Sequence, residues 1–452
     1  MVAIYSPTGE TGVNQRSARY PALNENQNLL GDILHPENLK LAWKQVRSNK
    51  GASGVDNITI EKFPAINRIE WKDIQHAIET GNYQPLPVKR IYIEKDDGSQ
   101  RKIGIPTVRD RVIQQAIVQI LSPHYELQFS DSSFGFRPKR SCHDAIQRVQ
   151  QVVKSGYKIA VDVDLSKFFD RINHDLLMSL IGKRVKDKRV MRLIGQFLRA
   201  GVKEKDQFFP STIGAPQGGP LSPLLSNILL DVLDKELEKR QHKFVRYCDD
   251  FMILVKSPRA GKRVLSSITR FLENRLILKV NETKSKVDRV DQCKFLGFSV
   301  VRNRIICHAT SLEKFKREVK RLTGRSWGVS MIFRYHKLKL YLRGWMNYFG
   351  IGLRYQQTCD LDQWIRRRIR MCYWKLWRKP RTKIRNLMKG GVSDMLAIRC
   401  GVSSKAYWRS AKTKGIQIAL NDAWLAKQGL FSLRESWISF THNSRTAHCG
   451  SA

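Results

Sequence analysis

Two adjacent carboxylates, Asp249 and Asp250, stand between apolar runs in the segment RYCDDFMILVKS. Apolar, β-favouring residues on both sides of a two-residue acidic tip predict a strand, a tight turn and a second strand. An Asp-Asp pair at such a tip is more often a solvated turn than a site. Carboxylates held there are nevertheless well placed to ligate a hard cation such as Mg²⁺. The segment therefore predicts a β-hairpin, and the rest of the sequence must decide what its tip does.

The charge of the chain favours a polyanionic partner. There are 81 Lys and Arg residues against 40 Asp and Glu, a formal net charge of +41, which is more than solubility requires. A membrane surface is the competing partner, but the chain lacks the run of about 18 apolar residues that would span a bilayer. Its start, MVAIYSPTGETGVNQRSARY, lacks the features of a secretory signal. We expect a cytoplasmic protein, bacterial or organellar in origin, without membrane partners.

Length and cysteine usage indicate a folded intracellular protein. With 452 residues and 42% hydrophobic content, the chain can form roughly three domains of about 150 residues. Its eight cysteines include no CxxC pair, and their gaps do not fit the spacing of zinc ligands. We expect reduced thiols and no structural zinc site.

Further acids and a glycine turn lie upstream of the hairpin. Asp162 and Asp164 are two residues apart in VDVDL, so they project from the same side of a predicted strand. A salt bridge to a neighbouring Lys or Arg is the alternative role for either acid. Gln217 and Gly218 begin a backbone turn that brings main-chain groups close to whatever lies beside it. Ser222 is then expected to be the N-cap of the next helix.

A second hairpin is predicted in KRIYIEKDDGSQRKIGIP, because apolar and polar residues alternate on both sides of an Asp-Gly turn. Lys95 and Arg101 would flank that turn. Asp164, Asp249 and Asp250 on neighbouring strands make a site for two divalent metals, which suits in-line nucleotidyl transfer. Lys95 and Arg101 would then hold a triphosphate, and Gln217 with its glycines would line the nucleotide pocket.

The composition shifts after Cys307, and the remaining third is helical, aromatic and very basic. Residues 361–390 hold eleven Lys and Arg, one acid and four aromatic residues. Charge runs are usually solvated faces, but this balance favours contact with nucleic acid. The cations that we expect to contact nucleic acid, which the family resemblance described below specifies as RNA, are Arg366, Arg367, Arg368, Arg370, Lys375, Arg378, Lys379, Arg381, Lys383 and Arg385.

Taken in order, nine blocks resemble the reverse transcriptase/maturase proteins encoded by group II introns. With C-terminal matches they cover roughly residues 45–425. The blocks are SNKGASGVD, KRIYIEKDDGSQRKIGIPTVRDRVIQQA, SFGFRPKRSCHDA, VDVDLSKFFDRINHD, GAPQGGPLSPLLSNILLD, RYCDDFMIL, LKVNETKSK, FLGF and LRGWMNYFGI.

The resemblance implies an α/β (α+β) right-hand polymerase, with fingers and palm around an antiparallel palm sheet, followed by an α-helical thumb/maturase domain. We expect an N-terminal arm and helical extension at 1–85, fingers and palm at 86–305, thumb at 306–425 and a short tail at 426–452. The endonuclease domain that often ends members of this family has cysteine pairs, which are missing after Cys400. We therefore expect no endonuclease, so that insertion needs another source of primer.

Roles of single residues also follow from the resemblance. Asp164, Asp249 and Asp250 resemble the metal-binding acids, with Cys248 where Ala is commonest, and Asp162 is expected to be structural. The cofactor implied is two Mg²⁺ ions, with Mn²⁺ as a substitute. The substrate-binding residues implied are Lys95 and Arg101 at the triphosphate, Phe169 as the sugar-sensing aromatic, Gln217 and Gly218 in the nucleotide pocket, and Lys284 at the departing pyrophosphate.

The expected function is RNA-directed DNA polymerisation, with transfer of a dNTP to a primer 3′-hydroxyl, together with binding of the protein's own intron RNA for splicing and retrotransposition. The partners are group II intron RNA, an RNA template with a DNA primer, target DNA and dNTPs. A homodimer is left open. The alternatives are a splicing-only RNA-binding maturase and a host-adopted reverse transcriptase in defence or DNA repair.

Overall fold

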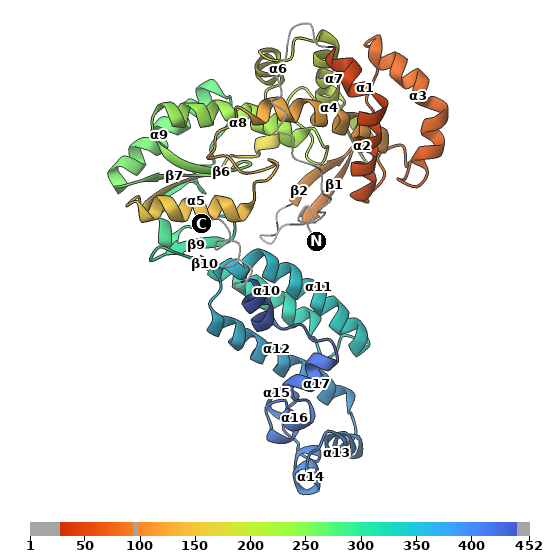
Figure 1. Ribbon diagram of the computed structural model, residues 1–452, viewed down its shortest axis with the longest axis vertical. Coiled ribbons are helices and arrows are strands. Elements are labelled where there is room, and N and C mark those ends of the chain that lie inside the picture. The colour runs from red at the N-terminus through yellow and green to blue at the C-terminus, as the bar shows by residue number, and fades with distance from the viewer. Residues whose placement is uncertain (1–27, 95–97, 99, 441–452) are drawn as a thin grey trace, which may run out of the picture.

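The computed structural model describes residues 28–94, 98 and 100–440 of the chain. Sheets and helices form a broad upper body, and a narrower arm of helices extends below it (Figure 1). The mixed α/β class with a helical C-terminal part is confirmed.

Helices pack around a central one at the N-terminal side of the upper body. The central helix carries apolar residues at helical spacing, and Val112, Ile113, Ala116 and Ile117 are all buried. The four helices are α1 (Leu29–Leu34), α2 (Pro36–Ser48), α3 (Phe63–Glu79) and the central α4 (Val108–Glu126).

The second predicted hairpin forms the start of a four-stranded sheet with the order β2-β1-β4-β5. Its first two strands are antiparallel, as the alternation predicts, while β4 joins β1 in parallel. The turn with Lys95 lies outside the described residues. The strands are β1 (Val88–Glu94), β2 (Gln100–Ile105), β4 (Val202–Glu204) and β5 (Gln207–Phe209).

The acid-bearing hairpin belongs to a separate four-stranded sheet, which we call the palm sheet, with the order β6-β7-β3-β8. Every neighbouring pair in it is antiparallel. Its strands are β3 (Ile159–Val163), β6 (Lys243–Tyr247), β7 (Asp250–Val255) and β8 (Lys286–Arg289).

Helices cover both faces of the palm sheet, so alternate residues of one strand enter different cores. Val161 and Ile253 pack in the core that includes α8 and α9, whereas Ala160 and Leu254 pack with α5. The helices are α5 (Cys142–Lys154), α8 (Ser222–Lys239) and α9 (Pro258–Arg275). Along the chain, β3 is followed by η1 (Phe168–Arg171), α6 (His174–Gly182) and α7 (Lys188–Arg199) before β4 begins.

The segments LILKVNETKSK and CKFLGFSVV, although both rich in apolar residues, do not pair with each other as strands. Strand β8 instead joins the palm sheet, and after η2 (Val290–Gln292) the strand β9 (Phe298–Val301) pairs with β10 (Arg304–Cys307). The reason is local: Arg302 and Asn303 both have positive φ, 49° and 61°, as a two-residue primed hairpin turn requires.

The arm below is entirely helical in the part of the chain that the structure describes, and it has its own apolar core around the buried Trp374. Its elements are α10 (Ala309–Leu322), α11 (Met331–Phe349), η3 (Gly350–Gly352), α12 (Tyr355–Leu376), α13 (Pro380–Lys389), α14 (Asp394–Gly401), α15 (Tyr407–Ser410), α16 (Lys414–Ala419) and α17 (Asp422–Lys427).

Aromatic rings connect the arm to the upper body. Phe298 of β9 stacks on Tyr348 of α11 with 5.6 Å between ring centroids, and Phe349 lies 5.3 Å from the same ring. His143 of α5 joins this group through a 2.7 Å contact between its Nε2 and the Tyr348 carbonyl. We call these four residues the aromatic joint.

Candidate active site

The predicted acidic hairpin is present, with a different tip. Tyr247 pairs with Asp250, so the two turn residues are Cys248 and Asp249, and Asp250 begins the strand β7. Cys248 has φ of 60°, the sign that a primed hairpin turn requires at its first central residue. The two carboxylates therefore belong to different parts of the hairpin: Asp249 lies in the turn, and Asp250 is the first residue of the strand.

Asp164 directly follows β3, and its main chain is held on both sides. Its amide donates to Ser285 Oγ at 3.0 Å, and its carbonyl accepts from the Asn281 amide at 2.8 Å. Lys284 lies in the same turn and is exposed. Ser285 and Asn281 were missed by the sequence reasoning, because nothing local in NETKSK marks a contact with a strand more than a hundred residues upstream.

Three acids project from one face of the palm sheet. Asp162 stands opposite Met252 in the register, and Asp164 and Asp250 lie two residues from these positions. Burial and, after it, the carboxylates of Asp249, Asp162 and Asp164 raise the pKa of Asp250 to about 7. Burial likewise raises the pKa of Asp162 to about 6, although Lys286 opposes the shift. The acids therefore sense one another as like charges.

This collection of acids fits a divalent cation in its chemistry. Burial raises the pKa of Asp249 too, against the opposing charge of Arg101, so the site disfavours several unneutralised carboxylates. All of the donors are hard oxygen atoms, the kind that Mg²⁺ prefers. Within the described residues, no three His, Cys, Asp or Glu side chains are already gathered as a metal cluster. The residues therefore fit a metal in their chemistry, and their side chains would have to move closer together to bind one.

Arg101 approaches the acids from the other sheet, and the glycine turn packs against the same strand, β2. Arg101 lies on β2 near enough to lower the pKa values of Asp249 and Asp250 against the effect of burial. The Gly104 amide donates to the Gln217 carbonyl at 2.7 Å. Gly218 has φ of 128°, and a Cβ there would lie 2.4 Å from the Gly104 carbonyl oxygen. Only glycine allows this close approach.

Phe169 and Gln217 meet at one cavity of about 90 Å³, whose lining also includes Lys102 and Arg90 of the first sheet. The structure therefore brings together two of the predicted nucleotide-pocket residues. Ser222 does not cap α8 as predicted: its hydroxyl donates to the Pro216 carbonyl at 2.6 Å, and the cap position is Leu221. It holds the glycine turn against the helix instead.

The basic residues of the arm fall into two groups. Those on α12 are engaged within the arm: Arg366 and Arg370 pair with Asp422, Arg367 lies 3.9 Å from the Trp408 ring, and Arg368 donates to Thr323. The second group is exposed, and the described part of the chain gives it no ion pair. It consists of Arg378, Lys379, Arg381 and Arg385.

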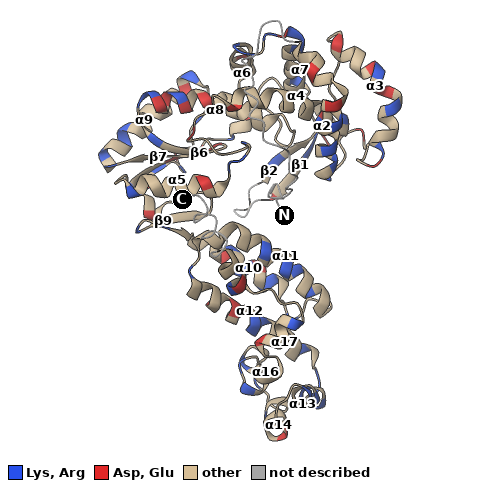
Figure 2. Cartoon of the chain, in the orientation of Figure 1, with Lys and Arg blue, Asp and Glu red and all other residues tan. Residues whose placement is uncertain are grey.

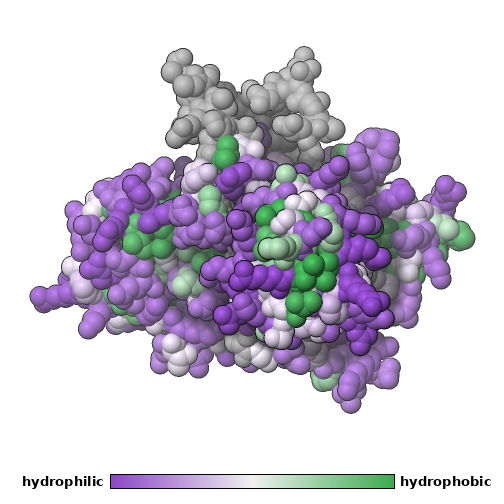
Figure 3. Space-filling model, turned by 90° about the horizontal axis from the view of Figure 1, so that it is seen from below, coloured by the Kyte–Doolittle hydropathy of each residue, from purple (hydrophilic) through white to green (hydrophobic). Residues whose placement is uncertain are grey.

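Two further predicted cations lie on aromatic rings. Lys375 is exposed and 5.4 Å from the ring of Tyr407, and Lys383 is 4.7 Å from the ring of Trp374. Basic residues are distributed along both body and arm (Figure 2). The far end of the arm, seen from below, also shows a group of apolar side chains (Figure 3). Exposed Met395 and Ile398 of α14 belong to this end.

Residues 93–300 match the family model of reverse transcriptases (RNA-dependent DNA polymerases), and residues 312–391 match the group II intron maturase-specific domain. Protein YkfC of Escherichia coli K12 is 35% identical over 319 residues, which are 62% of this chain and 84% of that protein. The chain belongs to the group II intron reverse transcriptase/maturase family. Asp164, Asp249 and Asp250 lie within the reverse transcriptase match, and most of the helical arm lies within the maturase match.

Other members of the family are longer. The intron-encoded protein LtrA of Lactococcus lactis is 31% identical over 59% of this chain and 55% of its own length. The COX1/OXI3 intron 1 protein of Saccharomyces cerevisiae is 27% identical over 61% of this chain and 40% of its own length. This reverse transcriptase thus spans about half the length of these two curated relatives.

The chain therefore contains a reverse transcriptase (RNA-dependent DNA polymerase) domain followed by a maturase-specific domain. A reverse transcriptase domain implies dependence on a divalent metal, and a maturase-specific domain implies binding of intron RNA. In the described residues, none of the helices combines the length and apolar character needed to cross a bilayer.

Proposed function

We propose that this reverse transcriptase extends a DNA primer on an RNA template with Asp164, Asp249 and Asp250 as its metal-binding catalytic acids. The observation that carries the proposal is their position at one end of the palm sheet, where burial and, after it, the neighbouring carboxylates raise the pKa of Asp250 to about 7. Mg²⁺ is the cation proposed, with Mn²⁺ as a substitute. When bound, such ions stabilise the attacking and leaving oxygens of nucleotidyl transfer.

The protein's own residues would orient the reactants. Arg101 lies beside the acids and would bind the triphosphate, since a guanidinium offers a planar fork of donors to phosphate oxygens. Phe169 and Gln217 line one cavity and would bound the sugar and base of the incoming dNTP. Lys284 is held in the turn next to Asp164 and would face the departing pyrophosphate. Lys95 is proposed as a second triphosphate contact and lies outside the described residues.

The arm is proposed as the thumb, with template and primer between it and the palm sheet. Exposed cations of α13 and the segment before it would contact the intron RNA during splicing, and target DNA during retrotransposition. A cytoplasmic site of action, and the division into domains at 85, 305 and 425, belong to the same proposal.

Primer extension tests the proposal. The double variant Asp249→Ala, Asp250→Ala should lose at least about 10³-fold in rate, because catalytic acids of this type act as a unit. Asp288→Ala is the matched control, since Asp288 lies on β8 of the same sheet and pairs with Lys286. Undiminished extension by the double variant would contradict the assignment.

Splicing measured on the wild type and the same double variant distinguishes the polymerase from a splicing-only maturase. A wild-type protein that promotes splicing of its intron but extends no primer, with splicing unchanged in the double variant, would favour that function. The convergence of all three acids favours polymerisation.

A further inference from the structure

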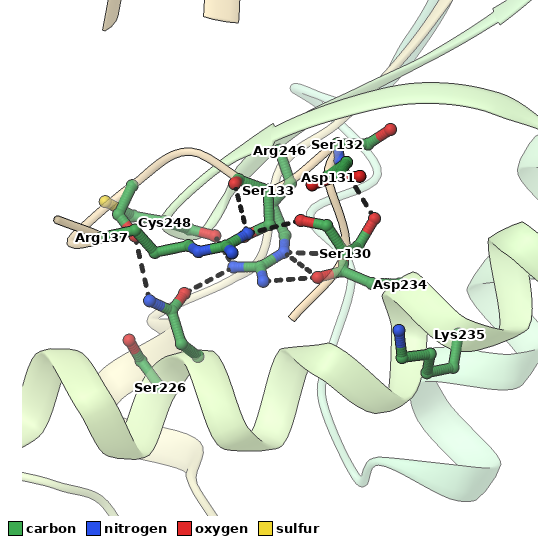
Figure 4. Close-up of polar contacts among 12 residues, drawn as sticks. Ser130, Asp131, Ser132, Ser133, Arg137, Ser226, Asp234, Lys235, Arg246 and Cys248 are labelled. Atoms are coloured by element: carbon green, nitrogen blue, oxygen red, sulfur yellow. Dashed lines mark hydrogen bonds and ion pairs between the residues drawn. The ribbon is translucent and has the colours of Figure 1, made fainter. Parts of the chain in front are cut away.

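Arg246 is fully buried directly beneath the acidic turn, in the strand β6. Its Nε donates to both carboxylate oxygens of Asp234 on α8, at 2.8 and 3.0 Å, and its Nη2 donates to the same carboxylate. Its Nη1 donates to Asn227 Oδ1 at 2.9 Å and to the Cys248 carbonyl at 3.0 Å. Figure 4 shows the guanidinium between Asp234 and Cys248.

A second contact holds the turn from the opposite side. Asn227 donates from Nδ2 to the Gly135 carbonyl at 2.9 Å. A Cβ at Gly135 would lie 2.3 Å from the Cys248 amide nitrogen, so the two main chains touch. The Phe134 amide in turn donates to the Arg246 carbonyl at 2.9 Å. Asn227 therefore joins the arginine and the 134–135 segment into one support for Cys248.

The supported residue is the one whose conformation sets the direction of the acids. Cys248 has φ of 60° without being glycine, and such geometry persists only where the surroundings enforce it. Its carbonyl belongs to the peptide bond that leads into Asp249, so fixing that oxygen fixes the plane from which Asp249 leaves the turn. Arginine suits this task because its planar fork can bind Asp234, Asn227 and the carbonyl at once.

A buried ion pair gives little evidence of a stabilising role, because apolar residues of equal volume often stabilise a fold as well or better. Side chains that lock a reacting group within about 0.5 Å of its working position are a different requirement, and buried hydrogen-bonded groups meet it. We propose that Arg246, held by Asp234 and Asn227, is a positioning residue that fixes the Cys248-Asp249 turn for catalysis. This proposal rests on the catalytic role given above to Asp249 and Asp250.

Arg246→Lys tests the proposal, since lysine keeps the charge but not the fork. We expect kcat for primer extension to fall about 100-fold, the effect of misplacing a catalytic group by about 1 Å. KM for the dNTP should stay within about twofold, because Arg246 does not reach the nucleotide pocket. A second readout is independent of activity: amide hydrogen exchange at residues 248–250 should be about tenfold faster than in the wild type.

Arg137→Lys is the matched control. Arg137 is also a buried arginine paired with a carboxylate, Glu126, and it donates to the carbonyls of Ser130 and Ser133. Among the described residues it makes no hydrogen bond to the turn. Arg137→Lys should lower the stability of the protein, while kcat for primer extension and amide hydrogen exchange at residues 248–250 stay as in the wild type. Equal loss of kcat in both variants, with unchanged exchange at the turn, would overturn the proposal.

Asn227→Ala serves if Arg246→Lys does not fold, because it keeps the Arg246–Asp234 ion pair and removes only the two hydrogen bonds of the Asn227 amide. It should lower kcat about tenfold and speed exchange at the turn, in line with the loss of about one hydrogen bond's free energy. Unchanged kcat and exchange would count against the positioning role. If the wild type extends no primer, the catalytic assignment itself fails. The hydrogen-exchange comparison then decides by itself whether Arg246 and Asn227 hold the Cys248-Asp249 turn in place.

Discussion

Asp110 is buried in the first turn of α4 and receives hydrogen bonds from two hydroxyl groups, Tyr83 Oη and Thr107 Oγ1, both at 2.7 Å. It is 1% exposed. Burial raises its pKa to about 6 from a usual 3.8, although the hydroxyl donors oppose the shift. At the scale of one residue, the fold thus holds this proton more tightly than the unfolded chain does, and stability must depend on pH.

The sign of that dependence is a loss of stability with rising pH. The contribution of Asp110 is fully present below about pH 4 and is lost as pH rises through about 6, and a shift of about two units corresponds to about 3 kcal/mol. We expect the free energy of unfolding of the wild type to fall by about this amount relative to Asp110→Asn between pH 4 and pH 8. Denaturant titrations across that range measure it, and parallel curves would show that Asp110 has the same pKa in the folded and unfolded states.

At the scale of elements, the glycine turn lies against β2 with no space between their main chains. Gly218→Ala would place a Cβ 2.4 Å from the Gly104 carbonyl at a φ of 128°, so the turn and the strand must separate. Because Gln217 and Arg101 are on these two elements, we expect kcat/KM for dNTP to fall about 100-fold.

Steady-state primer extension measures this effect. Gly328→Ala is the control, since a Cβ at Gly328 would meet nothing within 4 Å, and its kcat/KM should match the wild type. An active Gly218→Ala protein would mean that the turn does not shape the nucleotide pocket.

The elements also show what local patterns could predict. Alternation in KRIYIEKDDGSQRKIGIP and the apolar, β-favouring runs in RYCDDFMIL predicted real strands, because both patterns are visible within about six residues. The contacts of Asp164 with Ser285, and of Cys248 with Gly135, could not be predicted, since they join segments more than a hundred residues apart. Similarly, the charge of Arg370 predicted RNA binding, whereas its burial and its pairing with Asp422 favour a role within the arm.

At the scale of the whole molecule, the chain has a net charge of +41, and some of its basic residues form contacts within the fold while others are exposed and can bind phosphate groups. We expect affinity for intron RNA to fall steeply with salt. Replacing the exposed Arg378, Lys379, Arg381 and Arg385 with Ala should reduce the slope of log affinity against log salt by about 3, because each phosphate contact contributes about 0.7 to 0.9.

The control has the same change of charge elsewhere. Arg259, Lys262, Arg263 and Arg270 are exposed on α9, which lies at the far side of the upper body from the arm (Figure 1). Replacing these four with Ala should change the slope by less than about 1. Filter binding across a salt series measures both slopes, and equal changes in the two variants would show that the arm's exposed cations are not a preferred contact for RNA.

Because the aromatic joint lies at the base of the arm, a small rotation there displaces the far end of the arm by several ångströms. Helix α12 has 22 residues and is therefore about 33 Å long, so a tilt of about 10° at its base moves its far end by about 6 Å. That displacement approaches two steps of 3.4 Å along a nucleic acid strand. If the arm binds the template and primer as proposed, unstacking Phe298 from Tyr348 would change which phosphates its cations can reach, and the joint would set the register of the bound strand.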